Sequence, residues 1–412
     1  MHGCLFLCMK FVAILLLLIM LLGAGCSRPG HPDGGTPPCT TVPQPVTRDC
    51  NSGNCPEMNI AGDLPATTPG NFRGFADAGI SRDPLTGKFW LAYSWPHIIQ
   101  GKDPEGKTVY MAAVSTHLAN SDDGKNFTFV REVWPSVPAV DPEKSGETGI
   151  ISSETPSIVP MQSGGTITWY SARLRYFLEP RTGYHPKYAT SWTVRIGAAS
   201  SPDRLADAEE VTLGVSQTSS AYNPAVQLDK LAGLPVTRCA MLNNPTLFAE
   251  DGTLYLIVEC LAFRGTTLDV AHSTLQEFYT TPVGDPSSWV WKHAGVLADA
   301  SLARQLGQDT IQQPDVSLAS DGTPILIITP AHEDPANPVG TTGDGCVALE
   351  LASLNPPELK RDCNGNAVVR ARINGQYIAC THTPSSATGI IAGHVENNNA
   401  GPWTLHASGL RP

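Results

Sequence analysis

The sequence predicts an all-β fold, a five-bladed β-propeller, from three observations. An apolar run, a Gly-containing turn and a second apolar run recur along the chain, as in β-hairpins. The copies lie at 77–94, 154–171, 244–258 and 313–329. Further apolar runs follow three of the copies, at 109–130, 192–211 and 346–354. The chain also has 38 Gly and 35 Pro, which suits a loop-rich β protein. Two hairpins make a four-stranded sheet, and repeated sheets of this kind predict propeller blades.

Residues 1–26 are predicted to be a targeting segment. Lys10 precedes an apolar run at 11–22, which is too short to cross a membrane as a stable helix. The run ends in LLGAGC, which resembles the lipobox of bacterial lipoproteins, with Cys26 as the lipidated residue and Gly23 where Leu is usual. The resemblance implies a protein held at the cell envelope by a lipid anchor, at the outer membrane in a Gram-negative cell because Ser27 follows. A secretory signal cleaved nearby is the alternative.

Residues 27–69 are rich in Pro and Gly and show no hydrophobic period, so we expect a disordered linker. Eight cysteines follow Cys26, an even number that indicates disulfides in an exported chain. Cys239 and Cys260 flank the 244–258 hairpin and are the favoured pair. One of the last three cysteines is expected to bond the 39–55 cluster; they are Cys346, Cys363 and Cys380.

Residues 70–412 are predicted to be the propeller domain. Four short apolar runs between turn residues predict a fifth blade near the C-terminus; they lie at 367–373, 377–383, 389–395 and 403–407. Ring-closing folds remove exposed edge strands. We therefore expect a strand from near the N-terminal end of the domain to close the ring.

Four polar residues stand at the front of the repeated hairpins: Asp77, Glu154, Asn244 and Asp315. The innermost strand of each blade lines the central channel, so these residues should meet at one mouth of the channel. The alternative is that each residue caps a turn. A net charge of −11 without a Lys/Arg cluster argues against nucleic acid, and no metal-type Cys pair occurs.

The chain resembles the five-bladed glycosidases of the arabinanase, levansucrase and invertase group. The resemblance rests on FADAG and KFWLAYS at 75–94, on the polar-x-Pro hairpin starts and on RIGAASSPDRLADA at 195–208. It implies that Asp77 is the base or nucleophile, and that Glu154 stands where the group has an Asp. The group's general acid, a Glu, is replaced at Asn243-Asn244-Pro245. Asn cannot transfer a proton at neutral pH, so Asp315 is the candidate for a second catalytic carboxylate.

Glu259 beside Cys260 resembles the Glu-Cys pair of invertases, but it lies at the far end of its hairpin. We therefore expect it away from the mouth, in a structural role. A calcium ion is held through a His in some propeller glycosidases, and His382 is the nearest candidate; no other cofactor and no metal site follow from the sequence.

A second resemblance is to sialidases. Arg73 in NFRG is similar to the arginine with which that family binds a carboxylate, and 121–127 resembles an Asp-box turn. Three aromatic residues are candidates for stacking on sugar rings, with strand core as the alternative: Trp95, Trp169 and Tyr170. The basic and aromatic stretch 172–188 is long for a connection between strands, which is typical of functional insertions.

The sequence thus predicts a lipid-anchored, extracytoplasmic, glycoside hydrolase-like protein that acts on or binds carbohydrate. Catalysis stays open because of Asn244. The alternatives are a non-catalytic propeller that binds glycans or proteins and a sialidase-like hydrolase.

Overall fold

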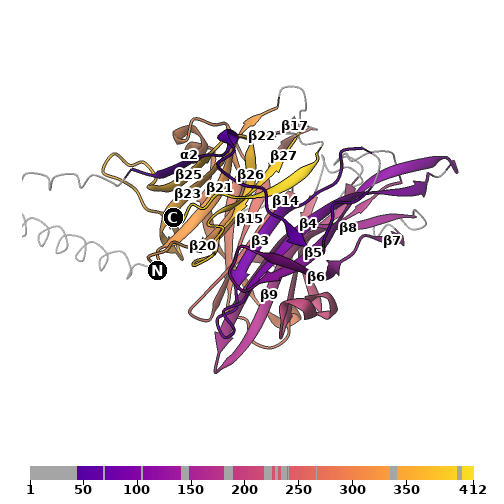
Figure 1. The fold of residues 1–412 in the computed structure, drawn as a ribbon, viewed down its shortest axis with the longest axis horizontal. Helices are drawn as coiled ribbons and strands as arrows, with labels where there is room; N and C mark the ends of the chain where they lie inside the picture. Colours follow the sequence, from indigo (N-terminus) through magenta and orange to yellow (C-terminus); the bar gives the residue numbers. More distant parts are fainter. Residues whose placement is uncertain are drawn as a thin grey trace, which may run out of the picture. The chain divides into compact units, whose positions relative to one another are not determined.

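Each main sheet is built largely from strands that follow one another along the chain, in a propeller arrangement. The structure is a computed structural model that describes residues 44–67, 70–103, 105–140, 148–180, 189–217, 225–227, 231–232, 239, 241–265, 267–334, 341–396 and 401–412. These residues belong to one compact unit, Val42–Pro412. Within this unit, the C-terminal strands in yellow lie beside the first strands in indigo (Figure 1).

In each of the first three sheets, the strand order runs from an inner strand to an outer edge. The first sheet contains β3 (Ala76–Arg82), β4 (Phe89–Lys102), β5 (Thr108–Ser121), β6 (Phe127–Trp134) and β2 (Ile60–Ala61). The second contains β8 (Thr148–Ser163), β9 (Thr166–Leu178), β10 (Ala189–Ala199), β11 (Glu210–Gln217) and β12 (Ala225–Gln227), with β7 (Val137–Val140) on the free side of β8. The third contains β14 (Met241–Glu250), β15 (Thr253–Leu261), β18 (Thr274–Thr280), β19 (Trp291–Ala298) and β13 (Leu231–Ala232).

The remaining elements complete the ring. The fourth sheet contains β20 (Thr310–Leu318), β21 (Pro324–Glu333), β23 (Cys346–Leu354), β25 (Val369–Asn374) and β1 (Val46–Asp49), with β22 (Thr341–Gly343) on β21 and β24 (Pro357–Leu359) on β23. The fifth contains β26 (Tyr377–Thr381), β27 (Ile391–Val395) and β28 (Trp403–Ala407). A small hairpin joins β16 (Phe263–Arg264) to β17 (Thr267–Leu268). The described helices are short: α2 (Ala300–Gln305), η1 (Cys50–Ser52), η3 (Pro202–Asp207) and η4 (Pro286–Ser288).

Apolar side chains fill the space between neighbouring sheets, because both faces of a blade are covered by other blades. Five clusters of buried apolar residues are present: four join two sheets that are adjacent in the ring, and one joins the first three sheets. One of them joins the last sheet to the first, for example through Leu405 and Leu91. Removal of this apolar surface from water is the main stabilising contribution of the ring.

The five inner strands contact one another in order, and β26 contacts β3. Each inner strand also carries a β-bulge, near its start in four of them and midway along β8, with a residue at positive φ. Bulges of this kind re-aim side chains and occur next to functional sites. The residues at positive φ, with φ of 44°, 51°, 42°, 51° and 48°, are Asp77, Thr155, Asn244, Gln313 and Ala379.

The N-terminal chain is fastened to the outer edges of three sheets. β1 pairs in parallel with β25, and β2 pairs in parallel with β6. Between them, the backbone N–H of Met58 donates to the Leu405 carbonyl at 2.7 Å, on the edge of the fifth sheet. The backbone N–H of Phe75 donates to the Trp403 carbonyl on the same edge at 3.0 Å. Among the described residues, the N-terminal chain thus adds hydrogen bonds to the edge of the fifth sheet, whereas its two strands precede residue 70 and pair with the fourth and first sheets; closure by a strand of the predicted domain stays a prediction.

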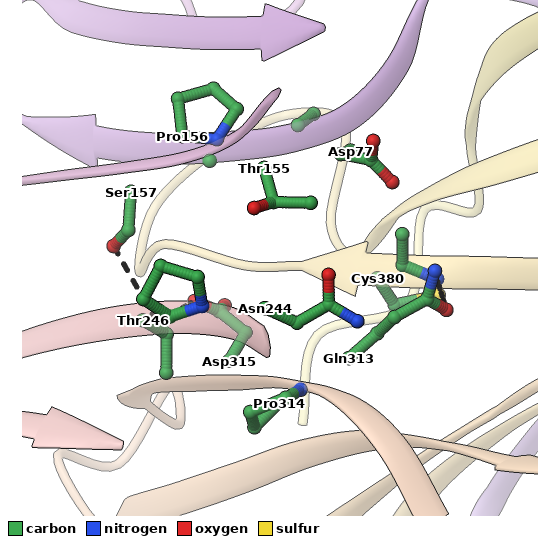
Figure 2. Close-up of a pocket in the computed structure, with 14 residues that line it drawn as sticks. Asp77, Thr155, Pro156, Ser157, Asn244, Thr246, Gln313, Pro314, Asp315 and Cys380 are labelled. Carbon is green, nitrogen blue, oxygen red and sulfur yellow. Dashed lines mark hydrogen bonds between the residues drawn. The ribbon is translucent and has the colours of Figure 1, made fainter. Parts of the chain in front are cut away.

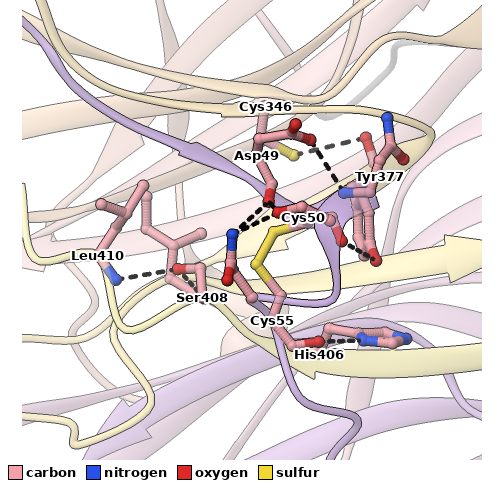
Figure 3. Close-up of a disulfide and its surroundings, with 12 residues drawn as sticks. Asp49, Cys50, Cys55, Cys346, Tyr377, His406, Ser408 and Leu410 are labelled. Atoms are coloured by element: carbon pink, nitrogen blue, oxygen red, sulfur yellow. Dashed lines mark hydrogen bonds between the residues drawn. A yellow bond between two sulfur atoms is a disulfide. The ribbon is translucent and has the colours of Figure 1, made fainter.

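A local disulfide shapes the N-terminal segment. Cys50 and Cys55 are bonded, and their backbone carbonyls accept hydrogen bonds from Tyr377 (3.3 Å) and from His406 Nδ1 (2.8 Å), as Figure 3 shows. Residues 44–67 therefore belong to the folded unit, and the expectation of a disordered linker over 27–69 is wrong for this part. Short strands that are held by the edges of other sheets carry little apolar periodicity of their own.

The other disulfides are partly as predicted. The favoured pair, Cys239–Cys260, is present. Cys346 is bonded to Cys380, and Cys363 also forms a disulfide. A bond from these cysteines to the 39–55 cluster lies partly outside the described residues, because Cys39 does.

The predicted all-β propeller arrangement is confirmed, but the number of complete blades differs. Four sheets contain at least four strands, whereas the fifth contains three among the described residues. The predicted fifth blade used 367–373 as its first strand, but this run lies in β25 and completes the fourth sheet. In the part of the chain that the structure describes, no helix has the length and hydropathy needed to cross a bilayer.

Candidate functional site

The β-bulges of the five inner strands surround a pocket at one mouth of the central channel. It encloses about 40 Å³, and the five bulge residues at positive φ all line it. Figure 2 shows side chains from several inner strands facing one space, among them Asp77, Thr155, Asn244 and Gln313. This enclosed volume holds only a few water molecules. A sugar ring would therefore have to lie at the mouth, above the ring of bulges.

A second cavity of about 170 Å³ continues along the same inner strands. The two cavities share Gly79, Ser157 and Asp315, so the channel runs on past the bulges. His382 is buried and lines this second cavity, where burial lowers its pKa to about 4. Among the described residues, no group of three His, Cys, Asp or Glu side chains could hold a metal ion.

The predicted ring residues do not all occupy equivalent positions. Asp77 and Asn244 are the first residues of their bulges, as expected. Glu154 precedes the bulge residue Thr155, and Asp315 lies two residues after Gln313. Asp77, Asn244 and Asp315 line the pocket, and Glu154 stands beside its rim on the strand that carries Thr155.

Asp77 and Glu154 are electrostatically coupled. Burial raises the pKa of Asp77 to about 6, against the opposing effect of a hydrogen bond from Ser94. Burial, and then the charge of Asp77, raise the pKa of Glu154 to about 8, while a hydrogen bond from the Tyr176 hydroxyl (3.1 Å) opposes the shift. At neutral pH the pair therefore holds an ionised Asp77 and a protonated Glu154.

Asp315 occupies a more enclosed position between the two cavities. Its carboxylate accepts hydrogen bonds from the Thr246 hydroxyl at 3.2 Å and from the His382 backbone N–H at 3.1 Å. Burial raises its pKa to about 7, and these hydrogen bonds oppose the rise. These contacts join three sheets, which gives Asp315 a structural role whatever its chemistry.

Glu259 lies beside the mouth, so the expectation that it would lie far from it is wrong. β15 runs antiparallel to β14, and Glu259 therefore pairs with Asn243 at the start of β14. Its carboxylate accepts hydrogen bonds from Asn243 Nδ2 (3.0 Å), Asn244 Nδ2 (2.9 Å) and the backbone N–H of Gln313. The end of a second strand lies next to the start of the first in any hairpin. Glu259 is only 2% exposed, which places it behind the ring rather than in the pocket.

The candidate substrate-binding aromatic residues lie outside the pocket lining. Trp169 and Tyr170 are buried in two different apolar clusters on the faces of the second sheet. Trp95 is half-buried, stacks on His117 with ring centroids 4.7 Å apart and donates from Nε1 to the Leu64 carbonyl. Strand alternation explains the two core residues, because their side chains point into the apolar space between blades.

Arg73, the candidate for carboxylate binding, is exposed on the chain that leads into β3, and its carbonyl accepts a hydrogen bond from Trp403. It does not line the pocket. The Asp-box-like turn is present as a staple: the Asp123 carboxylate accepts hydrogen bonds from the backbone N–H groups of Lys125 and Asn126, each at 2.8 Å. Cys26 lies outside the described residues.

The sequence reasoning missed Thr155, Gln313, Ala379 and Cys380 as lining residues. The signal for two of them is present in the chain. Aligning the Pro residues of Thr155-Pro156, Asn244-Pro245 and Gln313-Pro314 puts the first residue of each pair at one position of the ring.

The solved structures that the chain resembles include members of the glycosidase group suggested by the sequence motifs. A family 117 glycoside hydrolase of the marine bacterium Zobellia galactanivorans has 10% identity and a TM-score of 0.45, over 85% of this chain and 88% of that one. Bacillus subtilis arabinanase has 10% identity and a TM-score of 0.39, over 84% and 95%. Aspergillus awamori exo-inulinase has 12% identity and a TM-score of 0.45, over 83% and 63%.

A scan with protein-family models finds no match for the sequence, and a search of curated proteins finds no relative. The propeller arrangement therefore rests on the strand pairing and on the ring of bulges described above.

Proposed function

We propose that this protein hydrolyses glycosidic bonds with Asp77 as base or nucleophile and Glu154 as general acid. The observation that supports the proposal is the coupling of these two carboxyl groups, with pKa values raised to about 6 and about 8. Two carboxyl groups whose environments separate their pKa values are the arrangement that glycoside hydrolysis uses. Asn244 occupies the third ring position and binds Glu259, so the acid would come from the second sheet instead.

In this mechanism the sugar lies at the mouth with its anomeric carbon near Asp77. Protonated Glu154 gives its proton to the glycosidic oxygen as the bond to the anomeric carbon breaks. Ionised Asp77 either takes a proton from the attacking water or attacks the anomeric carbon itself, and the separation of the two carboxyl groups decides between these courses. Water then supplies the hydroxyl group of the released sugar.

The test is hydrolysis of a panel of oligosaccharides by the folded domain. Wild type should release sugar from at least one member, and Asp77→Asn should remove this activity while the melting temperature stays near that of wild type. Asp122→Asn is a matched control, because the Asp122 side chain is 88% exposed on a turn, and it should leave the rate unchanged.

Activity that survives Asp77→Asn would overturn the site assignment. Binding of a glycan by wild type without any hydrolysis would overturn catalysis and favour a binding protein. The small enclosed volume and the amide at Asn244 are the observations that favour that second candidate.

We also propose that the fifth sheet acts as a fifth blade. Its inner strand carries the fifth bulge, at Ala379, and contacts both β20 and β3. The N-terminal chain adds hydrogen bonds to the free edge of β28, where a fourth strand would lie. Export and attachment through a lipid at Cys26 belong to the same proposal and are supported by the LLGAGC motif. Labelling with a fatty-acid probe, with Cys26→Ser as the control, tests the anchor.

A further inference from the structure

Three arginine side chains lie together on the face of the second sheet that is turned toward the first sheet. Arg173 and Arg195 are directly opposite each other on β9 and β10. Arg175 lies two residues from Arg173 on β9, and alternate residues of a strand share one face. All three guanidinium groups therefore lie close together, next to the part of the second sheet that leads to the mouth of the channel.

Glu210 is the carboxylate that interacts with this group of arginines. Arg173 binds it with two hydrogen bonds, from Nε at 3.0 Å and from Nη2 at 2.7 Å. The remaining nitrogen of Arg173 donates to the Ser153 hydroxyl at 2.7 Å, and its guanidinium lies over the ring of Trp134 at 4.8 Å. Arg173 is thus a buried and fully paired residue, and Glu210 is already occupied by it.

Among the described residues, Arg175 and Arg195 lack such partners. Arg195 donates from Nη1 to the Thr212 hydroxyl, but its Nε is buried and has no hydrogen-bond partner in the part of the chain that the structure describes. The side chain of Arg175 makes no hydrogen bond or ion pair among the described residues, and it is half-buried. Burial lowers the pKa of both groups, repulsion from Arg175 adds to the effect on Arg195, and Glu210 opposes it.

The cluster therefore carries three positive charges and one negative charge in a partly dehydrated place, although the whole chain has a net charge of −11. Charges removed from water are costly unless an opposite charge compensates them. Guanidinium groups match the planar, two-oxygen geometry of carboxylates and the oxygens of sulfate esters better than an ammonium group does. An oxyanion is thus the kind of group that would compensate these charges.

We propose that Arg175 and Arg195 bind an oxyanion, the carboxylate or sulfate ester of an acidic glycan. The location relates this site to the mouth, because Ser153, which Arg173 binds, lies on β8 two residues before Thr155 of the ring. The inference deepens the proposed function, on which it rests, by naming the class of carbohydrate. Polyanions such as nucleic acids are disfavoured by the overall negative charge.

The test is calorimetric binding of oligogalacturonate, of the same oligosaccharide with its carboxyl groups reduced, and of a sulfated galactan oligosaccharide. The Asp77→Asn protein is used so that no turnover occurs. At least one acidic glycan should bind ten times more tightly than the reduced one, and the difference should shrink at high salt. The acidic glycan that binds identifies carboxylate or sulfate as the group recognised.

Arg175→Met and Arg195→Met should each weaken binding of the acidic glycan about tenfold and leave binding of the neutral glycan unchanged. Arg175→Lys keeps the charge without the fork and should give an intermediate affinity. Arg304→Met is the matched control, because Arg304 is exposed on α2, and it should bind as the parent does.

Equal affinity for acidic and reduced glycans, or acidic binding that both Arg→Met variants retain, would overturn the inference. The two proposals fail separately. If wild type binds acidic glycans in a charge-dependent way but hydrolyses none, the proposed hydrolysis is wrong and the anion site stands. If wild type hydrolyses neutral glycans alone, the anion site is wrong and the proposed hydrolysis stands.

Discussion

The mouth of the channel has two sides that share a backbone conformation and differ in how well their polar groups are satisfied. On the side of the first two sheets, Asp77 and Glu154 each accept one side-chain hydrogen bond from the described residues, from Ser94 and Tyr176, and the buried Thr155 hydroxyl has no partner among those residues. On the side of the third sheet, the Glu259 carboxylate accepts three hydrogen bonds.

This difference teaches that the ring of bulges fixes where side chains point, whereas the donors around each carboxyl group decide what it can do. Hydrogen bonds favour the ionised form of a carboxyl group and hold it in place. Burial raises the pKa of Glu259 as it does those of Asp77 and Glu154, but the carboxyl groups with few donors keep a free oxygen for a substrate. The carboxyl group with three donors instead fixes Asn243, Asn244 and the backbone of Gln313.

The largest expected effect comes from removing the proton of Glu154. The proposed mechanism requires Asp77 ionised and Glu154 protonated, so the rate should rise through pH 6, where Asp77 loses its proton, and fall through pH 8, where Glu154 does. Glu154→Gln should lower the rate about 10²- to 10⁴-fold and abolish the fall above pH 8. Initial rates from pH 4 to pH 10 measure both effects.

A substrate with a nitrophenyl leaving group supplies the control, because it departs without protonation and should suffer much less from Glu154→Gln. An unchanged alkaline limb in this variant would assign the acid to another group. Asp315, with a pKa raised to about 7, is the next carboxyl group to test.

A second prediction tests whether burial alone, away from the mouth, raises the pKa of a carboxyl group. Glu277 on β18 is completely buried opposite Ile257, at the apolar contact with the fourth sheet, and neither carboxylate oxygen has a hydrogen-bond partner among the described residues. Burial raises its pKa from 4.5 to about 8. The folded state therefore prefers the protonated form, and stability should fall as pH rises from 4.5 toward 8.

Glu277→Gln removes this titration. The variant should be more stable than wild type by about 3 kcal/mol at pH 7 and nearly equal to it at pH 4, as measured by urea unfolding. Its rate of hydrolysis should stay that of wild type, because Glu277 lies outside the pocket lining. A stability difference that is independent of pH would show that Glu277 is ionised in the folded protein.

Local patterns predicted the hairpins, the position of Asp77 and the bond between Cys239 and Cys260, because each depends on residues close in sequence. The exact ring positions depend on where each bulge falls, and a bulge shifts every later side chain by one place. For this reason Glu154, the ring residue that the sequence predicts in the second sheet, lies one residue before the bulge residue Thr155. Asp315, the one predicted in the fourth sheet, lies two residues after the bulge residue Gln313. The sequence predicts Glu259 far from the mouth because it lies at the opposite end of its hairpin along the chain, but the pairing of β14 with β15 brings it next to Asn243.

Other features needed the assembled ring. The arginine cluster is visible only when the registers of β9, β10 and β11 are known, since Arg173 and Arg195 are far apart in sequence. The N-terminal strands β1 and β2 contain two to four residues, which is too few to show a period. Their pairing is decided by the free edges of the sheets that they meet.

The smallest expected effect is a change in folding stability that compares backbone strain on the two sides of the mouth. Thr155 has φ 51°, and its hydroxyl is buried with no hydrogen-bond partner in the described ranges. A β-branched residue at positive φ is strained, and only Gly adopts this conformation freely. Thr155→Gly should therefore stabilise the fold by about 1 kcal/mol, the relief of strain less the greater freedom of Gly in the unfolded chain.

Asn244→Gly is the matched variant at the equivalent position, where φ is 42°. Asn tolerates this conformation, and the substitution removes the hydrogen bond to Glu259, so it should destabilise the fold by about 1 kcal/mol. Opposite signs in urea unfolding would support a strained side and a satisfied side of one mouth. Equal changes in the two variants would mean that the backbone of the bulges, and not the surrounding hydrogen bonds, sets the stability of both sides.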